Sequence, residues 1–383
     1  MSHFNMLVFP ALVLPLAGFY GMELSQVLAI SFWMYLLFGL TALPWGLLSD
    51  RFGAKPFLLL FFLGAGACGI GAAYFIDSPV IFSLFLAGIG LFSGIYHPAG
   101  LGLISQGMQR MAMAMGYNGV AGNAGLAAAP LMAGMINYFF GIKAVFLCVG
   151  LLNLAGALVM GLLSIDEPPK KSGTGTNDSG RLIRGFIILC ICMMLGGIAY
   201  RGVTVILPSY FELKDPALLD ALSRLVWLPG SRNVAATVLS SLVFFVGMLG
   251  QYVGGIVAER SEPRKAYLWF HLAALPLAFS IAYTADISML VVIIGYMFFL
   301  LGMQPIENTL VARFTPDKVR HSAYGAKFVL TFGVGAVAVH MVGWIKETWS
   351  LPAVFVAIGL ISVAIVLSIS LLIVSTKSIS IEN

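Results

Sequence analysis

Four ionisable side chains lie inside long apolar runs of this 383-residue sequence: His97, Arg201, Glu307 and His340. A charge in such a run is costly unless it is paired or faces water, so each one marks a candidate functional position. Histidine exchanges protons near physiological pH, and a carboxyl group is the alternative proton carrier. Arginine keeps its charge and holds a carboxylate or a phosphonate with two hydrogen bonds. These residue types suit the binding of an anion and the movement of protons.

Each side chain also has a plainer interpretation that the sequence leaves open. His97 can be a packing histidine whose ring nitrogens are satisfied. Arg201 can form a structural pair with an acidic or carbonyl partner. Glu307 can form a static ion pair with Lys327, which begins a later apolar run, or with Arg313.

The composition indicates which elements carry these residues. Hydrophobic residues make up 60% of the sequence and charged residues 10%, against about 45–50% and about 25% in soluble domains. A transmembrane helix needs about 20 mostly apolar residues, and runs of this kind recur along the chain. We predict an all-α integral membrane protein with twelve transmembrane helices, at residues 4–22, 25–48, 57–76, 80–106, 112–138, 143–164, 185–210, 234–257, 266–284, 288–312, 322–345 and 352–374.

Two charged turns with glycines are spaced as internal repeats. The turn Gly46–Pro56 separates the second and third predicted helices, and Gly255–Lys265 separates the eighth and ninth. Matches at an offset of 209 residues include Gly46 with Gly255, Asp50 with Glu259 and Lys55 with Arg264. We therefore predict two same-direction repeats, a six-helix half at residues 1–165 and another at 185–383, joined by a polar linker at 166–184.

The basic residues are distributed unequally between the predicted loops. If both termini are cytoplasmic, fourteen basic residues lie in the inner loops and tail and five in the outer loops. This bias is expected when basic loops stay inside, so we place the charged turns in the cytoplasm and the chain in a bacterial inner membrane. The first apolar run lacks the leader and cleavage site of a signal peptide, and we expect it to be retained.

The outer connection at residues 211–233 is longer than the other outer connections. Its Leu218, Leu219, Leu222 and Leu225 have the spacing of one apolar helix face. We predict a short amphipathic helix on the membrane surface there.

The sequence lacks three common enzyme motifs. There is no phosphate-binding glycine loop ending in Lys-Ser or Lys-Thr, no His-Glu-x-x-His and no Gly-x-Ser-x-Gly. The four cysteines fall in apolar runs, where a thiol behaves as a small hydrophobe. We expect no enzymatic activity, no cofactor and no metal site. The formal charge of +5 follows from membrane topology, so we expect no nucleic-acid partner.

The turn Gly46–Pro56, its second copy, the two six-helix halves and the polar linker together resemble the major facilitator superfamily of secondary transporters. The resemblance covers nearly the whole chain. It implies alternating access, in which the halves rock about a site in mid-membrane. It also implies that Asp50 caps the positive end of a helix in the other half. The implied cytoplasmic gate comprises Gly46, Asp50, Arg51, Gly53, Lys55, Glu259, Arg260 and Arg264.

A second patch is similar to a bacterial branch that includes fosmidomycin-resistance-type exporters. It comprises Gly94–Ala99 and the glycines and Pro130 of the next span. The chain departs from this pattern in two ways. Its fourth span lacks an arginine that many proton-coupled members carry, and Ala129 precedes Pro130 where the exporters have glycine. The resemblance favours efflux.

The family architecture places the first, fourth, seventh and tenth spans around a central cavity, which makes His97, Arg201 and Glu307 its ionisable lining. Tyr96-His97-Pro98 and Gln304-Pro305-Ile306-Glu307 occupy comparable places in the two repeats, where a proline bends the helix and frees a carbonyl group. Asn123 either contacts a ligand or joins helices. We predict the substrate-binding set His97, Arg201, Glu307, Tyr96, Asn123 and Gln304, with His97 or Glu307 as the proton carrier.

The sequence thus predicts a monomeric secondary transporter that moves a small anionic or zwitterionic solute and is coupled to protons. His97, Arg201 and Lys327 are positive or can become so, against one intramembrane acid, Glu307, which favours an anion. Its partners would be the solute, protons and the lipid bilayer. Two alternatives stay open, a lipid or lysolipid flippase on the same fold and a membrane scaffold or sensor that does not transport.

Overall fold

The structure is a computed structural model of the whole chain, and it describes residues 1–107, 111–165, 179–223, 230–315 and 320–377. Within these ranges it contains helices and no strand, which confirms the all-α prediction. The first helices are α1 (Ser2–Ala11), α2 (Val13–Tyr20), α3 (Leu24–Ile30), α4 (Phe32–Leu40), α5 (Ala42–Phe52), α6 (Ala54–Tyr74), α7 (Pro79–Ser93), α8 (Tyr96–Gly107) and α9 (Met111–Leu162). The later ones are α10 (Ser179–Lys214), α11 (Pro216–Ser223), α12 (Arg232–Arg260), α13 (Pro263–Tyr283), α14 (Asp286–Phe314), α15 (Arg320–Phe328), the π-helical turn η2 (Val329–Gly333), the 3-10 turn η3 (Val334–Ala336), α16 (Val337–Thr348) and α17 (Ala353–Ser375).

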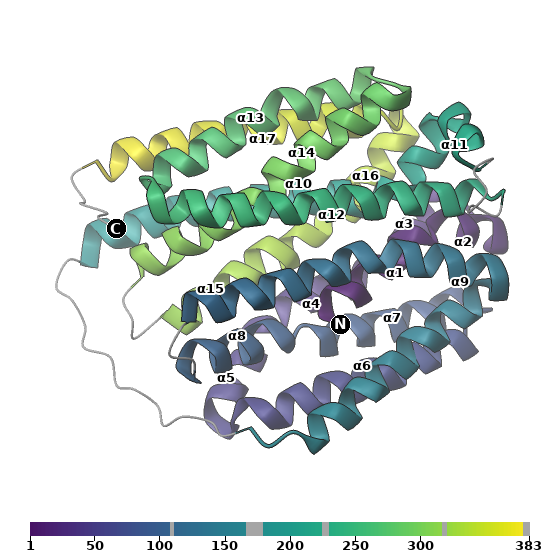
Figure 1. Cartoon of the computed structure of the whole chain (residues 1–383), viewed down its shortest axis with the longest axis horizontal. Coiled ribbons are helices and arrows are strands. Elements are labelled where there is room, and N and C mark those ends of the chain that lie inside the picture. Colours follow the sequence, from purple (N-terminus) through teal and green to yellow (C-terminus); the bar gives the residue numbers. More distant parts are fainter. Residues whose placement is uncertain (108–110, 166–178, 224–229, 316–319, 378–383) are drawn as a thin grey trace.

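Many of these helices are long and apolar enough to cross a membrane. Among the residues described there are nine, or up to eleven if each of two bent pairs counts as one span. The first pair, α1 and α2, is bent by 50°, and the second, from α3 to α5, by 41°. Helix α9 counts once, although Gly141 has a non-helical backbone (φ 79°, ψ 170°) and the two arms run in opposite directions (Figure 1). The chain therefore crosses a membrane many times, while the number twelve stays a prediction.

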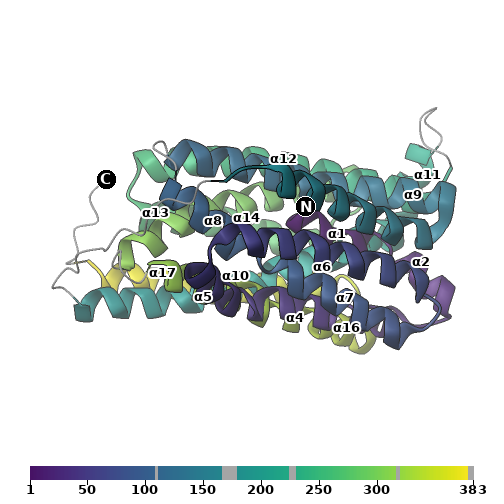
Figure 2. The same ribbon diagram turned by 90° about the horizontal axis from the view of Figure 1, so that it is seen from below.

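The helices lie in two groups that follow the sequence (Figure 1). We call α1–α9 the N half and α10–α17 the C half. The long helices of both groups run along a common direction (Figure 2). The halves meet where α9 packs on α12, α1 on α10, α3 on α16 and α4 on η2. The predicted linker lies mostly outside the described residues, but α10 already begins at Ser179, inside the predicted 166–184 segment.

Local sequence explains where helices change at the charged turns. Gly53 has φ 92°, a conformation that suits glycine, so α5 ends there and α6 begins directly after it. In the second turn, Glu262 caps α13 by accepting hydrogen bonds from the backbone N–H groups of Arg264 and Lys265. Pro263 occupies the first position of that helix, where its missing N–H is harmless.

The helix predicted in the 211–233 connection is present as α11, Pro216–Ser223. Leu219 is fully buried, and the helix packs against α12. Asp215 caps it by accepting a hydrogen bond from the Leu218 N–H at 3.3 Å. Leu225 lies outside the described residues.

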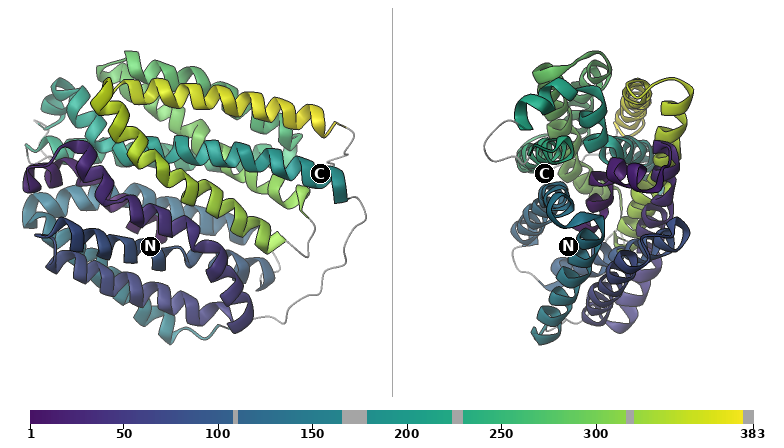
Figure 3. Two further views of the ribbon diagram at one scale, coloured as in Figure 1. Left: turned by 180° about the vertical axis from the view of Figure 1, so that it is seen from behind. Right: turned by 90° about the vertical axis from the view of Figure 1, so that its right-hand side faces the viewer.

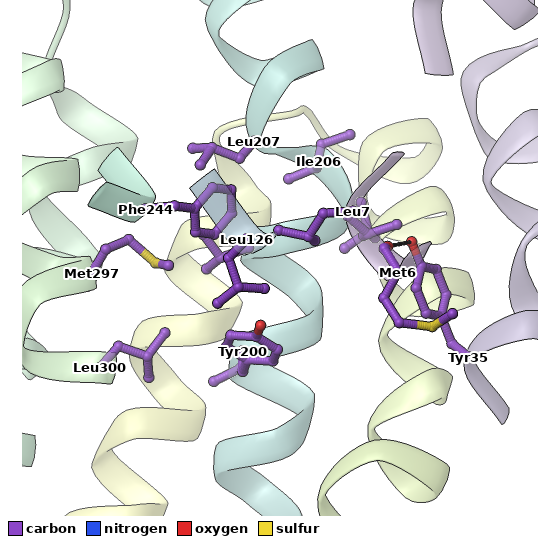
Figure 4. Packing of buried hydrophobic residues seen from close by; sticks show 14 of the residues in the cluster. Met6, Leu7, Tyr35, Leu126, Tyr200, Ile206, Leu207, Phe244, Met297 and Leu300 are labelled. Atoms are coloured by element: carbon purple, nitrogen blue, oxygen red, sulfur yellow. Dashed lines mark hydrogen bonds between the residues drawn. The ribbon is translucent and has the colours of Figure 1, made fainter. Parts of the chain in front are cut away.

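One cluster of buried apolar side chains extends through both halves. Figure 4 shows part of it, with Leu7 and Leu126 of the N half beside Tyr200, Met297 and Leu300 of the C half. The halves therefore meet across a mainly apolar interface, and each polar side chain within it needs a reason.

Helix α1 begins in the middle of the molecule rather than at one of its ends (Figures 1 and 3). Ser2 and Asn5 are buried. Ser2 Oγ donates to the carbonyl oxygen of Ser93 at 3.1 Å, and Asn5 Nδ2 donates to Ser93 Oγ at 3.0 Å. The start of the chain, including Ser2 ahead of the predicted first span 4–22, thus reaches the interior of the bundle.

Candidate functional site

Arg201 lies on α10 where the two halves meet, and only 2% of it is exposed. Its guanidinium carbon is 3.7 Å from the ring centroid of Tyr35, on α4, and 5.9 Å from that of Tyr200. Nε and Nη1 have no hydrogen-bond partner in the described part of the chain. Ring faces stabilise a cation but do not satisfy its N–H groups, so this buried charge is only partly compensated. Nε and Nη1 therefore have no acid or carbonyl partner among the residues described.

Glu307, on α14, has the opposite surroundings. It is 2% exposed, and its Oε1 lies 2.7 Å from the ammonium nitrogen of Lys327, on α15. Its Oε2 accepts a hydrogen bond from the Tyr267 hydroxyl at 2.7 Å. Lys327 also donates to Asn308. The ion pair with Lys327 that the sequence left open is therefore present, and both carboxylate oxygens are occupied.

His97 lies on α8 within a cluster of rings from both halves. Its ring stacks on Phe328 with a centroid distance of 4.6 Å, and Phe38 and Phe332 lie at 5.7 and 5.6 Å. It is 7% exposed, and Nε2 has no hydrogen-bond partner among the described residues. His97 is thus packed as the plainer interpretation proposed, but one ring nitrogen is not satisfied.

Two residues of this centre were missed by the sequence reasoning. His3 makes an edge-to-face contact with His97 at 5.0 Å, and Tyr35 supplies the ring beneath Arg201. His3 precedes the predicted first span, and Tyr35 is one of many aromatic residues in apolar runs. The buried Tyr35 hydroxyl donates to the carbonyl oxygen of Met6 at 3.1 Å (Figure 4), a long-range contact that no local pattern indicates.

The predicted polar residues form a separate set that joins the halves. Asn123, on α9, donates to Gln251, on α12, and Gln251 Nε2 donates to Gln304 Oε1 at 2.7 Å. Tyr96 instead donates to Asn118 within the N half. These bonds fit the role of joining helices, and substrate binding by this set stays a prediction.

The backbones of three helices meet at the π-helical turn η2. A Cβ atom added to Gly39, on α4, would lie 1.9 Å from the backbone nitrogen of Gly333, and one added to Gly197, on α10, would lie 2.1 Å from the carbonyl oxygen of Thr331. The path from α15 through η2 to α16 crosses the molecule obliquely (Figure 3). Only glycine fits at positions 39 and 197 in this packing.

A second group of contacts joins the halves at the end of the bundle that carries α11. Lys346 and Glu23 form an exposed ion pair at 3.3 Å, and Ser25 donates to Glu347. The ring of His340 packs on Phe32 at 4.5 Å, so this histidine of the apolar runs lies near the same end. The halves are therefore tied together there by α3, α4 and α16.

The first charged turn packs closely within the N half. A Cβ atom on Gly46 would lie 3.1 Å from Pro98 Cβ. Lys55 Nζ donates to the carbonyl oxygen of Leu163 at 2.6 Å, which ties the start of α6 to the segment after α9. The guanidinium carbon of Arg51 lies 5.2 Å from the ring of Phe52.

The second charged turn contains equivalent hydrogen bonds. Arg264 Nη1 donates to the carbonyl oxygen of Thr376 at 2.5 Å and to its Oγ1 at 2.9 Å, and Arg264 Nε lies 2.6 Å from Glu262 Oε1. Glu259 and Arg260 are exposed. Each turn therefore holds the start of one helix to the end of the last helix in its half. Gating by these residues and by Asp50 stays a prediction.

Two shallow grooves of about 470 and 510 Å³ lie on the N half, away from these buried charges. The first is lined by α6 and α9, including Leu59 and Leu162, and the second by the two arms of α9. Their linings are almost wholly apolar, as expected for a surface that faces lipid tails.

Comparison with known proteins agrees with this architecture. The model of the Major Facilitator Superfamily matches residues 2–339. The inner membrane transport protein YajR of Escherichia coli (strain K12) is 24% identical over 362 residues, which are 90% of this chain and 76% of that protein.

Two solved structures share the fold at low sequence identity. One is a bacterial homologue of the human lysosomal transporter Spinster, in an inward-facing and unoccupied conformation, with TM-score 0.69, 14% identity and coverage of 98% of this chain and 92% of that one. The other is the peptide transporter POT in complex with sulfate, with TM-score 0.74, 14% identity and coverage of 98% and 92%. Because the family model covers most of the chain, the protein belongs to the major facilitator superfamily, a family of membrane transporters.

Proposed function

We propose that this protein is a secondary transporter that moves a small anionic or zwitterionic solute across the bacterial inner membrane by alternating access, in exchange with or together with protons. Export is the direction we propose, on the resemblance of Gly94–Ala99 to an exporter branch. The observation that carries the proposal is Arg201, a buried guanidinium at the meeting of the halves with two nitrogens that lack an acceptor. An anion supplies that acceptor.

The placement of Arg201 suits alternating access. Its charge rests on Tyr35 of the N half, while its own helix belongs to the C half. A ligand bound to Arg201 is therefore contacted by both halves, and a change in their packing changes its surroundings. This dependence lets ligand binding select one arrangement of the halves.

The pair Glu307 and Lys327 is the proposed proton site. A proton on Glu307 removes the ion pair and leaves the ammonium of Lys327 without its anion. Because Glu307 is on α14 and Lys327 on α15, protonation weakens the contact between these helices. His97 is the second proposed carrier, since its Nε2 has no partner among the described residues.

Anion binding is tested on the full-length protein in detergent. Thermal unfolding is followed with the sodium salts of benzoate, lactate, glutamate, phosphate and sulfate. We expect at least one to raise the unfolding temperature in a saturable way, and Arg201→Lys to weaken its binding about tenfold or more, because lysine lacks the planar fork. Arg232→Lys is the matched control, since Arg232 forms an exposed ion pair with Asp220 at 2.7 Å. Equal affinity in the wild type and Arg201→Lys rejects the assignment.

Proton coupling is tested in proteoliposomes with the radiolabelled form of the anion that binds. We expect Glu307→Gln combined with Lys327→Met to abolish uptake driven by a pH gradient while counterflow of the same anion continues. The double substitution removes both charges, so neither is left buried alone. His97→Asn is measured beside it. Driven uptake at the wild-type rate in both variants overturns the coupling assignment, and binding without any counterflow in the wild type favours a sensor over a transporter.

A further inference from the structure

Thr331 is unusual among the threonines of this bundle. A threonine in a membrane helix normally donates its hydroxyl to a carbonyl group one turn earlier. Thr41, Thr309 and Thr315 do so, with distances of 2.6, 3.0 and 2.6 Å to the residue four positions before each. The Thr331 hydroxyl is buried, yet it has no hydrogen-bond partner among the described residues.

The π-helical turn gives a physical reason for this hydroxyl. Thr331 is the central residue of η2, Val329–Gly333, and the following residues form a 3-10 turn. Its backbone therefore departs from the α-helical geometry that brings a threonine hydroxyl to the earlier carbonyl group. Single π turns inside helices are often found at functional sites, because they re-aim side chains and free polar groups.

Thr331 and Arg201 lie about one helical turn apart on neighbouring helices. The carbonyl oxygen of Thr331 is in contact with Gly197, which is one helical turn before Arg201 on α10. Tyr200 and Phe332, the neighbours of these two residues in sequence, have rings 6.4 Å apart. The two unpartnered donors, on α10 and on η2, therefore lie within about one helical turn of each other along α10.

Aromatic rings surround this region. Phe332 packs on Phe38 at 5.1 Å and on Phe328 at 5.7 Å with nearly parallel planes, and Tyr200 completes the group. Flat rings stack on one another with favourable geometry, so such a cluster favours a planar ligand over a puckered one of equal size.

The charge balance selects an anion over a zwitterion. A bound amino acid needs a carboxylate for its ammonium group as well as a cation for its carboxylate. Glu307 and Asp215 are the buried acids among the described residues. Both oxygens of Glu307 are occupied by Lys327 and Tyr267, and Asp215 caps α11 at the end of the bundle. Neither of these two acids is then a counterion for Arg201.

We propose that the transported solute is an aromatic monocarboxylate, with its carboxylate held by Arg201 and the Thr331 hydroxyl and its ring held against Phe38, Phe332 and Tyr200. This inference rests on the proposed function, because it names the solute class of the Arg201 site. It adds Thr331 as a binding residue and excludes zwitterionic solutes.

The solute class is tested by isothermal titration calorimetry on the full-length protein in detergent. Benzoate, cyclohexanecarboxylate and L-phenylalanine are compared, since they share a six-membered ring and a carboxylate but differ in planarity or in net charge. We expect benzoate to bind about three- to tenfold more tightly than cyclohexanecarboxylate, from ring stacking. We expect L-phenylalanine to bind roughly tenfold more weakly than benzoate or worse, from its unpaired ammonium group. Equal affinity for all three overturns the inference.

The role of Thr331 is tested with two variants. Thr331→Val removes the hydroxyl at constant shape and should weaken benzoate binding about tenfold, as for a hydrogen bond to a charged group. Thr331→Ser keeps the hydroxyl and should retain most of the affinity. Thr41→Val is the matched control, because that hydroxyl donates to its own helix. Wild-type affinity in Thr331→Val contradicts the assignment.

The failure of this inference and the failure of the proposed function give different results. If anions bind and Arg201→Lys weakens them, but benzoate has no advantage or Thr331→Val has no effect, the solute class is wrong and the transporter proposal stands. If no anion binds, or if binding does not depend on Arg201, both proposals fall together.

Discussion

Two buried charges of the C half, Glu307 and Arg201, have nearly equal exposure and opposite surroundings. Glu307 has an ammonium group and a hydroxyl on its two oxygens. Arg201 has ring faces and two nitrogens without an acceptor among the residues described. Under the proposed function, this difference separates the proposed proton site, where both charges are paired, from the proposed anion-binding site, where the cation is not.

The largest effect is expected where the paired charge is broken. Glu307→Gln leaves the ammonium of Lys327 buried without its anion, and we expect a loss of about 3–5 kcal/mol of stability. Thermal unfolding in detergent measures it. Adding Lys327→Met should restore most of the loss, because the remaining pair is neutral. An unchanged unfolding temperature in Glu307→Gln alone would show that the pair contributes nothing.

Removal of the unpaired charge of Arg201 should not lower the stability of the protein. Arg201→Met eliminates a buried cation whose N–H groups are unsatisfied, and we expect stability to stay the same or rise by about 1 kcal/mol. Anion binding should be lost at the same time. The same thermal unfolding and calorimetric measurements test both effects. A clear loss of stability would show that the charge of Arg201, like that of Glu307, is compensated in the folded protein. The contrast between the two residues would then not hold.

The contacts that hold the two charged turns differ in burial between the halves. Arg264 is buried and makes two hydrogen bonds to Thr376 and an ion pair with Glu262, whereas the hydrogen bond from Lys55 to Leu163 is exposed. We expect Arg264→Met to lower stability by about 1–2 kcal/mol and Lys55→Met by about 0.5 kcal/mol. Thermal unfolding of the two variants side by side is the measurement. Equal losses of stability in the two variants would mean that burial of these contacts does not affect their contribution.

The smallest expected change in stability concerns Asp215, a buried acid outside the membrane-spanning segments. Burial, and then the charge of Asp286, raise the pKa of Asp215 above its ordinary value. A raised pKa in the folded state means that the stability from this group is present in acid and is lost as pH rises through the raised value. Asp215→Asn keeps an oxygen for the Leu218 N–H and removes the charge.

We therefore expect Asp215→Asn to unfold at a slightly higher temperature than the wild type at neutral pH, and at the same temperature in acid. The control is Asp220→Asn on the same short helix, which loses an exposed ion pair with Arg232 and should show no gain. A gain that persists unchanged in acid would exclude the charge of Asp215 as its cause.

The fold was predictable because the bilayer imposes a length on every apolar run. The predicted spans 57–76, 266–284 and 352–374 correspond closely to α6, α13 and α17. The all-α fold and the superfamily resemblance are confirmed, while the exporter branch stays a prediction. The break predicted between 138 and 143 contains Gly141, whose non-helical backbone (φ 79°, ψ 170°) separates two arms of α9 that run in opposite directions (Figure 1).

The site was predictable only in part. His97, Arg201 and Glu307 stood out because an ionisable group is rare in an apolar run, and pairing of Glu307 with Lys327 was one of the interpretations weighed. His3, Tyr35 and Thr331 were missed for a common reason. Their roles depend on contacts between distant helices or on a π turn, and neither leaves a trace in local composition.

The glycine contacts at η2 restrict how the two halves move. Gly39, Gly197 and Gly333 each lie near the midpoint of a long path through the bundle, and Gly39 and Gly197 leave no room for a methyl group. Under the proposed alternating access, we expect the helices to rotate about these contacts rather than to separate there. A widening at the α11 end would then accompany a narrowing at the charged-turn end, which would keep the two ends of the bundle from opening together.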